Sequence, residues 1–184
     1  MEENNKIDLG KACSKYFSFK DFFECSDTYK SILCNNVPVE AETFQAVRNL
    51  AQEILDKVQE EFGRLDLTYG FCSSELNKHI KKNNYPRLDQ HAGHELNKKG
   101  NPICERLGFA VDFSVPEVAS QDVARFIVSR LNFDRLYYYG TDRPIHVSLN
   151  QNPIHSIVLM RLYGNRRIPS QISKEKFMNK NLSF

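Results

Sequence analysis

The most regular pattern of apolar positions in the chain lies between residues 40 and 62. The apolar residues recur there every three or four positions, and they are Phe44, Val47, Leu50, Ala51, Ile54, Leu55, Val58 and Phe62. This spacing places them on one face of an α-helix and predicts that the face packs into the core. Because Gly63 follows the pattern directly, we expect the helix to end there.

Shorter helices are predicted from capping residues and apolar spacing. Ser18 can cap the first of them, and Asp21 would lie in its first turn, where the helix dipole favours an acid. The predicted spans are 18–23, 75–82 and 120–131, and the sequence Asn-Asn-Tyr-Pro at 83–86 is expected to break the second. Residues 27–37 are expected to form a connection.

Short apolar or alternating runs predict strands, most of them in the second half of the chain. Their predicted spans are 65–69, 109–113, 134–139, 145–149 and 154–162. Because helices come first and strands cluster later, the expected fold class is α+β, with a mainly antiparallel sheet flanked by helices.

The composition is that of an ordinary globular protein, with 41% hydrophobic and 26% charged residues. At 184 residues the chain is long enough for one domain with a real core. We expect a flexible N-terminus over 1–16, the domain over 17–162 and a basic C-terminal tail over 163–184. The net charge of +2 is too small to indicate nucleic-acid binding by itself, although the tail could contact phosphates or an acidic partner.

Nothing in the sequence predicts export or membrane insertion. The N-terminus has no basic segment followed by an apolar one, and no run of about 18 apolar residues occurs. Five cysteines with no CxxC spacing are typical of reduced thiols in such a chain. We therefore expect a cytoplasmic protein that does not contact a membrane.

Histidines and carboxylates are concentrated at a few points. His91, His94 and Glu95 lie within five residues. Asp112 stands in an otherwise apolar strand, where an unpaired carboxylate would be costly, and His146 lies in a later apolar run. Histidine and carboxylate ligands together suit a zinc ion that keeps an open catalytic position. The sequence therefore predicts a metal site.

Several motifs, taken in order, resemble those of the D-Ala-D-Ala carboxypeptidase-like zinc peptidases, whose fold is shared with the hedgehog signalling domain. The sequence G-F-A-V-D at 108–112 is similar to the end of the family's first metal motif, and I-H-V-S at 145–148 is similar to its second. Further similar stretches lie at 16–22, 67–77 and 134–136. The resemblance covers about residues 16 to 150.

The resemblance implies a fold, a cofactor and a reaction. Zn²⁺ would be held by His91, Asp112 and His146, with water in the fourth position, and D-Q-H at 89–91 is similar to the family's S-Q-H. The implied activity is hydrolysis of a peptide or amide bond by metal-activated water. Cys72 stands where the family has a substrate-binding arginine, so Arg106, together with Tyr69, is the expected substrate contact.

The chain departs from the family pattern in the spacing of the ligands. The separation of His91 from Asp112 is longer than in the family, and strict spacing would make Glu105 the ligand. We prefer His91 with an insertion at about 94–107, while His94 and Cys104 remain further candidates.

The general base is a second departure. Many members carry a glutamate shortly before the last histidine, and here Tyr139 and Arg143 stand in that region. Asp142 and Glu95 are the predicted catalytic carboxylates, with Glu105 as a third candidate, because a base must lie within hydrogen-bond reach of the attacking water.

Other function classes remain open. The missing arginine and base favour a non-catalytic binding module that is stabilised by its metal. The basic tail favours a cytoplasmic phage or defence protein that acts near nucleic acid. A phage lysis enzyme would reconcile a cell-wall substrate with the lack of an export signal.

Overall fold

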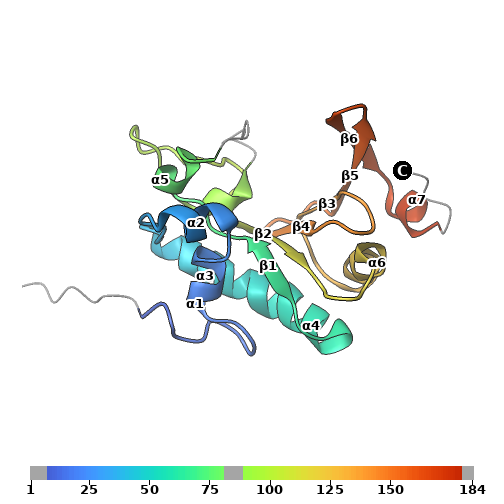
Figure 1. Ribbon diagram of the computed structural model, residues 1–184, viewed down its shortest axis with the longest axis horizontal. Helices are drawn as coiled ribbons and strands as arrows, with labels where there is room; N and C mark the ends of the chain where they lie inside the picture. The colour runs from blue at the N-terminus through green and yellow to red at the C-terminus, as the bar shows by residue number, and fades with distance from the viewer. Residues whose placement is uncertain (1–7, 81–88, 180–184) are drawn as a thin grey trace, which may run out of the picture.

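The computed structural model describes residues 8–80 and 89–179 (Figure 1). Six strands form one sheet in the order β1-β2-β4-β3-β5-β6. Their bounds are β1 Asp66–Tyr69, β2 Phe109–Ser114, β3 Arg135–Tyr138, β4 Ile145–Leu149, β5 Ser156–Tyr163 and β6 Arg166–Ile172. Neighbouring strands are antiparallel except β3 and β5, which run parallel, so the sheet is mixed. The predicted α+β class is confirmed.

Helical segments flank the sheet. Their bounds are α1 Phe19–Phe23, α2 Asp27–Ile32, α3 Ala41–Leu50, η1 Ala51–Leu55, α4 Asp56–Phe62, α5 Ser74–Asn77, η3 Gln90–Ala92, α6 Ser120–Arg130 and α7 Lys174–Met178. Within the described part of the chain, no helix combines the length and the apolar character needed to cross a membrane.

The long helix expected from the apolar stripe is confirmed. It runs without interruption through α3, η1 and α4, and η1 is a turn of π-helix. Val47, Leu50 and Leu55 on the stripe are fully buried. Gly63 ends the helix with a φ of 91°, which a glycine adopts without strain.

Three elements differ from the sequence-based expectation. The segment 27–32, predicted as a connection, forms α2, which Ser26 caps by accepting a hydrogen bond from the backbone N–H of Tyr29. This helix buries none of its residues, so it has no apolar stripe to predict it. Strand β6 and helix α7 also form within the stretch that was expected to be a basic tail. The predicted break at 83–86 lies outside the described residues.

The two faces of the sheet have different environments. Side chains alternate between the faces along each strand. Val111 on β2, Val147 on β4 and Leu136 on β3 lie side by side on the apolar face, which packs against α3 and α6 (Figure 1). The residues that alternate with these along the strands, many of them polar, lie on the opposite face of the sheet. We call this face the open face.

Gly108, directly before β2, offers a test of the close packing at this end of the sheet. A Cβ there would collide with the carbonyl oxygen of Leu149 and lie 2.6 Å from Cβ of Asn150. Gly100 has nearly the same φ, 76° against 78°, with no neighbouring atom within 4 Å. We expect Gly100→Ala to lower the free energy of unfolding by about 1 kcal/mol through backbone strain alone.

Gly108→Ala should lower the free energy of unfolding by about 3 kcal/mol, because the collision adds to that strain. Urea denaturation of both variants measures the difference. Equal losses would contradict the close approach between this glycine and the chain after β4.

Candidate metal centre

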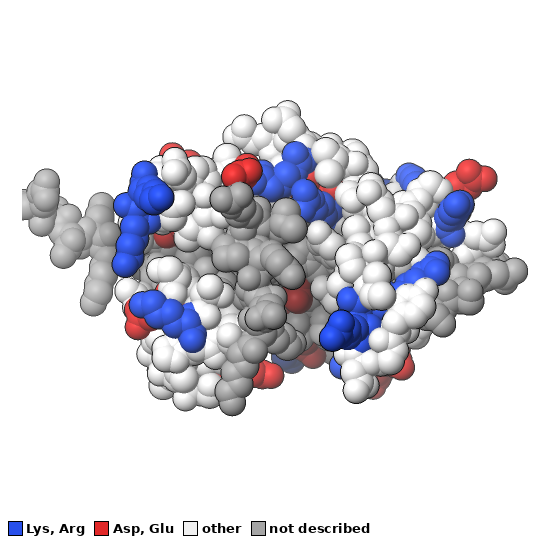
Figure 2. Space-filling view, turned by 90° about the horizontal axis from the view of Figure 1, so that it is seen from above, with Lys and Arg blue, Asp and Glu red and all other residues white. Residues whose placement is uncertain are grey.

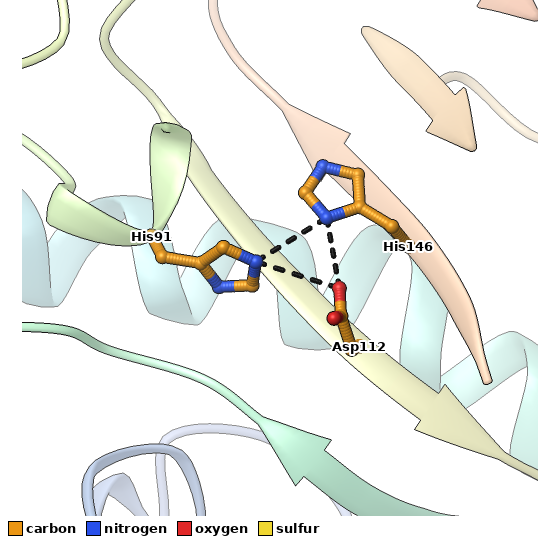
Figure 3. Close-up of side chains that lie close together, drawn as sticks. All are labelled: His91, Asp112 and His146. Atoms are coloured by element: carbon orange, nitrogen blue, oxygen red, sulfur yellow. Dashed lines mark hydrogen bonds and ion pairs between the residues drawn. The ribbon is translucent and has the colours of Figure 1, made fainter. Parts of the chain in front are cut away.

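Three of the predicted ligands meet at one point on the open face. His91 comes from η3, Asp112 from β2 and His146 from β4, and their side chains point toward one another (Figure 3). Nδ1 of His146 lies 2.8 Å from Oδ1 of Asp112 and 3.2 Å from Nε2 of His91. Nε2 of His91 lies 3.4 Å from the same Asp112 oxygen. We call these three residues the His-Asp-His cluster.

The sheet register brings two members of the cluster together. Asp112 and His146 are directly opposed in the antiparallel β2–β4 pair, so their side chains leave the same face as near neighbours. The 3-10 turn η3 lies against β2 and supplies the third member. The carbonyl oxygen of His91 also accepts a hydrogen bond from the backbone N–H of Cys72, which ties this turn to the chain after β1.

A backbone carbonyl orients the ring of His91. Nδ1 lies 2.8 Å from the carbonyl oxygen of Gly70. Because a carbonyl oxygen only accepts, Nδ1 donates to Gly70, and Nε2 is the nitrogen that faces Asp112 and His146. The ring of Tyr69 packs edge-on against it at a centroid distance of 4.3 Å. His91 is therefore held as a metal ligand would be.

The cluster favours negative charge on its carboxylate. Burial disfavours ionisation of Asp112, but its hydrogen bonds with His146 and His91 outweigh burial and hold the pKa of the carboxyl well below its usual range. Burial also lowers the pKa of His91, and the interaction with Asp112 outweighs it, so that this pKa is raised. Asp112 is therefore ionised at neutral pH and attracts a cation.

A buried polar network fixes η3 relative to the sheet. The side-chain amide of Gln90 donates to the carbonyl oxygen of Leu107 at 2.8 Å and to Oδ2 of Asp134 at 3.1 Å. Its carbonyl oxygen accepts from Oγ of Ser148 at 2.8 Å. Ser148 lies two residues after His146 on β4, so Gln90 links the turn that carries His91 to the strand that carries His146.

The donor atoms fit a divalent metal ion. A tetrahedral site with metal–ligand distances of about 2.0–2.1 Å separates its ligand atoms by roughly 3.3 Å. The three separations in the cluster are 2.8, 3.2 and 3.4 Å. Two imidazole nitrogens and one carboxylate oxygen also form a donor set common in catalytic zinc sites. The His-Asp-His cluster can therefore hold a metal through three protein ligands.

The rival ligands lie apart from this cluster. Glu105 is exposed, and the structure brings His91 rather than Glu105 to Asp112 and His146. Nε2 of His94 accepts a hydrogen bond from the backbone N–H of Gly108, at 3.2 Å. Cys104 is fully buried, and burial raises the pKa of its thiol.

The two carboxylates predicted to be catalytic are found in other surroundings. Glu95 is buried at the N-terminus of α3, where its oxygens accept hydrogen bonds from the backbone N–H groups of Val39 and Glu40 and from the hydroxyl of Thr43. Asp142 is exposed in the turn between β3 and β4. Both catalytic assignments stay predictions, and the contacts of Glu95 support a role in anchoring α3.

The two residues predicted to contact substrate differ in whether their side chains are already bound within the fold. Arg106 forms a forked ion pair with the buried carboxylate of Asp134 and donates to the carbonyl oxygen of Asn152, at 2.7 Å. Its guanidinium is therefore engaged within the fold. Tyr69 borders the cluster through its ring contact with His91. Their roles toward a substrate stay predictions.

Sequence reasoning assigned no role to two residues beside the cluster. Asp89 accepts a hydrogen bond from the backbone N–H of His91, and its charge contributes to the raised pKa values of His91 and Tyr69. The ring of Tyr137 packs edge-on against His146 at a centroid distance of 4.8 Å. Two signals could have indicated these residues. Asp89 lies in the D-Q-H stretch, and the strand that carries Tyr137 pairs with the strand that carries His146.

Glu95→Gln tests whether this side chain anchors α3. We expect the free energy of unfolding to fall by about 1–2 kcal/mol, because the charged acceptor for the N–H groups that lead into the helix becomes neutral. Glu42→Gln removes the same charge from an exposed position in the first turn and should change stability little. Equal stability of both variants in urea denaturation would contradict the anchoring role.

Comparisons of this chain with models of known families, with curated proteins and with solved structures find no match. The geometry of the His-Asp-His cluster is therefore the basis on which a function is assigned to this chain.

Proposed function

We propose that the chain is a zinc-dependent hydrolase of the peptidase or amidase type, with its metal held by His91, Asp112 and His146. The observation that carries this proposal is the convergence of three donor atoms, one from each residue, within 4.8 Å of one another. One of the three, Nε2 of His91, faces the other two because the carbonyl of Gly70 holds the opposite nitrogen. With three protein ligands, a fourth position is left for water or substrate.

The resemblance to the D-Ala-D-Ala carboxypeptidase-like zinc peptidases supports the same assignment. The three residues that its motifs single out are the three that meet in the fold. We extend the proposal to the architecture, a hedgehog/D-Ala-D-Ala peptidase-like domain, because the site lies on the open face of a sheet with helices on its other face.

The chain's own residues would prepare the reaction in three ways. Bound zinc would supply a water of lowered pKa and would polarise the carbonyl of the scissile bond. Asp112 supplies the negative charge that holds the ion, and Gly70 fixes the ring of His91. The rings of Tyr69 and Tyr137 lie on His91 and His146 and restrict the space beside them.

Asp89 is the carboxylate that we assign as proton acceptor. It lies two residues from His91, and its charge acts on the rings of His91, Tyr69 and Tyr139. One of its oxygens accepts from the backbone N–H of His91, which fixes the carboxylate at the start of the turn that carries His91. Glu95, by contrast, has its oxygens occupied at the N-terminus of α3.

A non-catalytic module that is stabilised by its metal is the second candidate function. The occupied carboxylate of Glu95 favours it, because one of the two predicted catalytic carboxylates is already committed to the fold. Tight zinc binding without hydrolysis of any amide substrate would support this alternative.

Metal analysis tests the centre directly. We expect about one zinc per chain in the wild type, and a fall in affinity of roughly 100-fold or more in His91→Ala and His146→Ala, because each variant loses one of three protein ligands. His155→Ala is the matched control, since this exposed histidine bonds Asn132 away from the cluster. Isothermal titration of the metal-free proteins with zinc gives the affinities. A wild type that binds no zinc would refute the centre.

Asp89→Asn tests the proton acceptor. The amide keeps an oxygen for the backbone N–H of His91, so zinc binding should persist, while kcat for a peptide or amide substrate should fall by about 10²- to 10⁴-fold. Asp142→Asn is the comparison, because that carboxylate was also a predicted base. Loss of turnover in Asp142→Asn but not in Asp89→Asn would reverse the assignment.

A further inference from the structure

The open face of the sheet continues past the His-Asp-His cluster to the edge strand β6. His146 on β4 pairs with Tyr137 on β3, and Tyr137 pairs with Val158 on β5. Further along the β5–β6 hairpin, the residues Met160 and Leu162 of β5 pair with Pro169 and Arg167 of β6. Because side chains alternate along each strand, all of these residues lie on the face that carries the cluster.

Arg167 is held over this face by two backbone carbonyls. Its Nη1 donates to the carbonyl oxygen of Tyr139 at 2.9 Å and to that of Met160 at 2.8 Å. Its guanidinium carbon lies 5.5 Å from the centroid of the Tyr139 ring. Both hydrogens of Nη1 are therefore used, and Nε and Nη2 make no hydrogen bond to the part of the chain that the structure describes.

The guanidinium lies against Tyr139, which continues the strand that borders the cluster. Tyr139 follows Tyr137 by two residues, and the ring of Tyr137 touches that of His146. Tyr139 directly follows β3, so one strand spacing and about two residues of rise separate its Cα from that of His146 by roughly 8 Å. The electrostatics agree, since burial and then the charge of Asp112 raise the pKa of Tyr139 while Arg167 opposes them.

The fixed guanidinium also differs from its basic neighbours. Lys and Arg side chains are spread over the half of the molecule formed by β5, β6 and α7 (Figure 2). Arg166 is exposed at the start of β6 and pairs with Tyr163, so it leaves the sheet on the opposite face. Arg167 is half-buried, lies on the face that carries the cluster and is fixed there by its two carbonyl partners.

We propose that Arg167 binds a carboxylate of the substrate, and that the substrate is a peptide with this acidic group two or three residues from the scissile amide. The proposal rests on the proposed function for the meaning of the scissile bond. An extended peptide advances about 3.3 Å per residue. A span of roughly 8–10 Å between the scissile amide and the acidic group therefore corresponds to two or three residues. The planar fork of arginine matches a carboxylate through paired hydrogen bonds, which a lysine cannot reproduce.

Binding to the metal-free protein tests this site separately from catalysis. The probes are dansyl-labelled pentapeptides added to protein in EDTA: Ala-Ala-Ala-Ala-Glu with an amidated C-terminus, the same peptide with Gln for Glu, and penta-alanine with a free C-terminal carboxylate. We expect the Glu peptide to bind wild type about tenfold more tightly than the Gln peptide. The penta-alanine arm shows whether a terminal carboxylate is accepted in place of a side chain.

The variants separate Arg167 from the general positive charge of the hairpin. In Arg167→Gln the Glu/Gln ratio of affinities should fall to near one, whereas Arg166→Gln, with the same loss of charge one residue away, should keep it. Arg167→Lys retains the charge without the fork and should leave a ratio of about two to three. Equal falls in Arg166→Gln and Arg167→Gln, or no preference in wild type, would overturn the proposal.

Two further measurements keep the outcomes distinct. Thermal unfolding must show Arg167→Gln to be folded, and otherwise Arg167→Lys alone decides the result. Zinc titration of the same variants should show unchanged metal affinity. A wild type that prefers the Glu peptide but binds no zinc would refute the metal centre and leave the carboxylate site standing. A wild type that binds zinc without this preference would refute only the role of Arg167.

Discussion

The antiparallel register of β2 against β4 is the constraint on which both the core and the site depend. It opposes Asp112 to His146 on the open face and Val111 to Val147 on the apolar face. A slip of one residue in either strand would turn its apolar side chains away from α3 and its member of the His-Asp-His cluster into the core. The hydrophobic burial that stabilises the sheet therefore also aligns Asp112 with His146, and no separate interaction is needed to bring them together.

The third member of the cluster depends on a different kind of interaction. His91 lies in a turn that has no ladder of its own, and buried polar contacts hold it in place through Gln90, Ser148 and the wholly buried Asp134. The low local dielectric strengthens the hydrogen bonds of such a network. The network stabilises the fold only while every member is bonded, because a buried polar group without a partner lowers the free energy of unfolding. Arg106 completes it by pairing with Asp134. Because the guanidinium of Arg106 is bound in this network, it is engaged within the fold, although Arg106 lies close to the cluster in sequence.

The sequence predicted the parts of the molecule in which one local pattern determines the structure. The stripe from Phe44 to Phe62 has a clear helical period, and the apolar run around Asp112 identifies a strand and its exceptional carboxylate. Helix α2 buries no residue and β6 alternates mainly exposed with half-buried positions, so neither has an apolar pattern to read. The partners of Glu95 and Arg106 are distant in sequence, and their contacts exist only after folding. For the same reason, Arg167 beside Tyr139 could not be foreseen.

The excursion between η3 and β2 is closed at its base. The backbone N–H of Gly108 bonds the ring of His94, and Leu96 and Pro102 form an isolated bridge farther out. These contacts fix both ends of the loop. Each doubling of the number of residues beyond them would therefore raise the free-energy cost of closing the loop by only about 0.6 kcal/mol. The tip at 97–101 is thus a position where insertions can accumulate without moving His91 relative to Asp112. Evolution, or a protein engineer, can diversify the chain there while the residues of the His-Asp-His cluster keep their spacing.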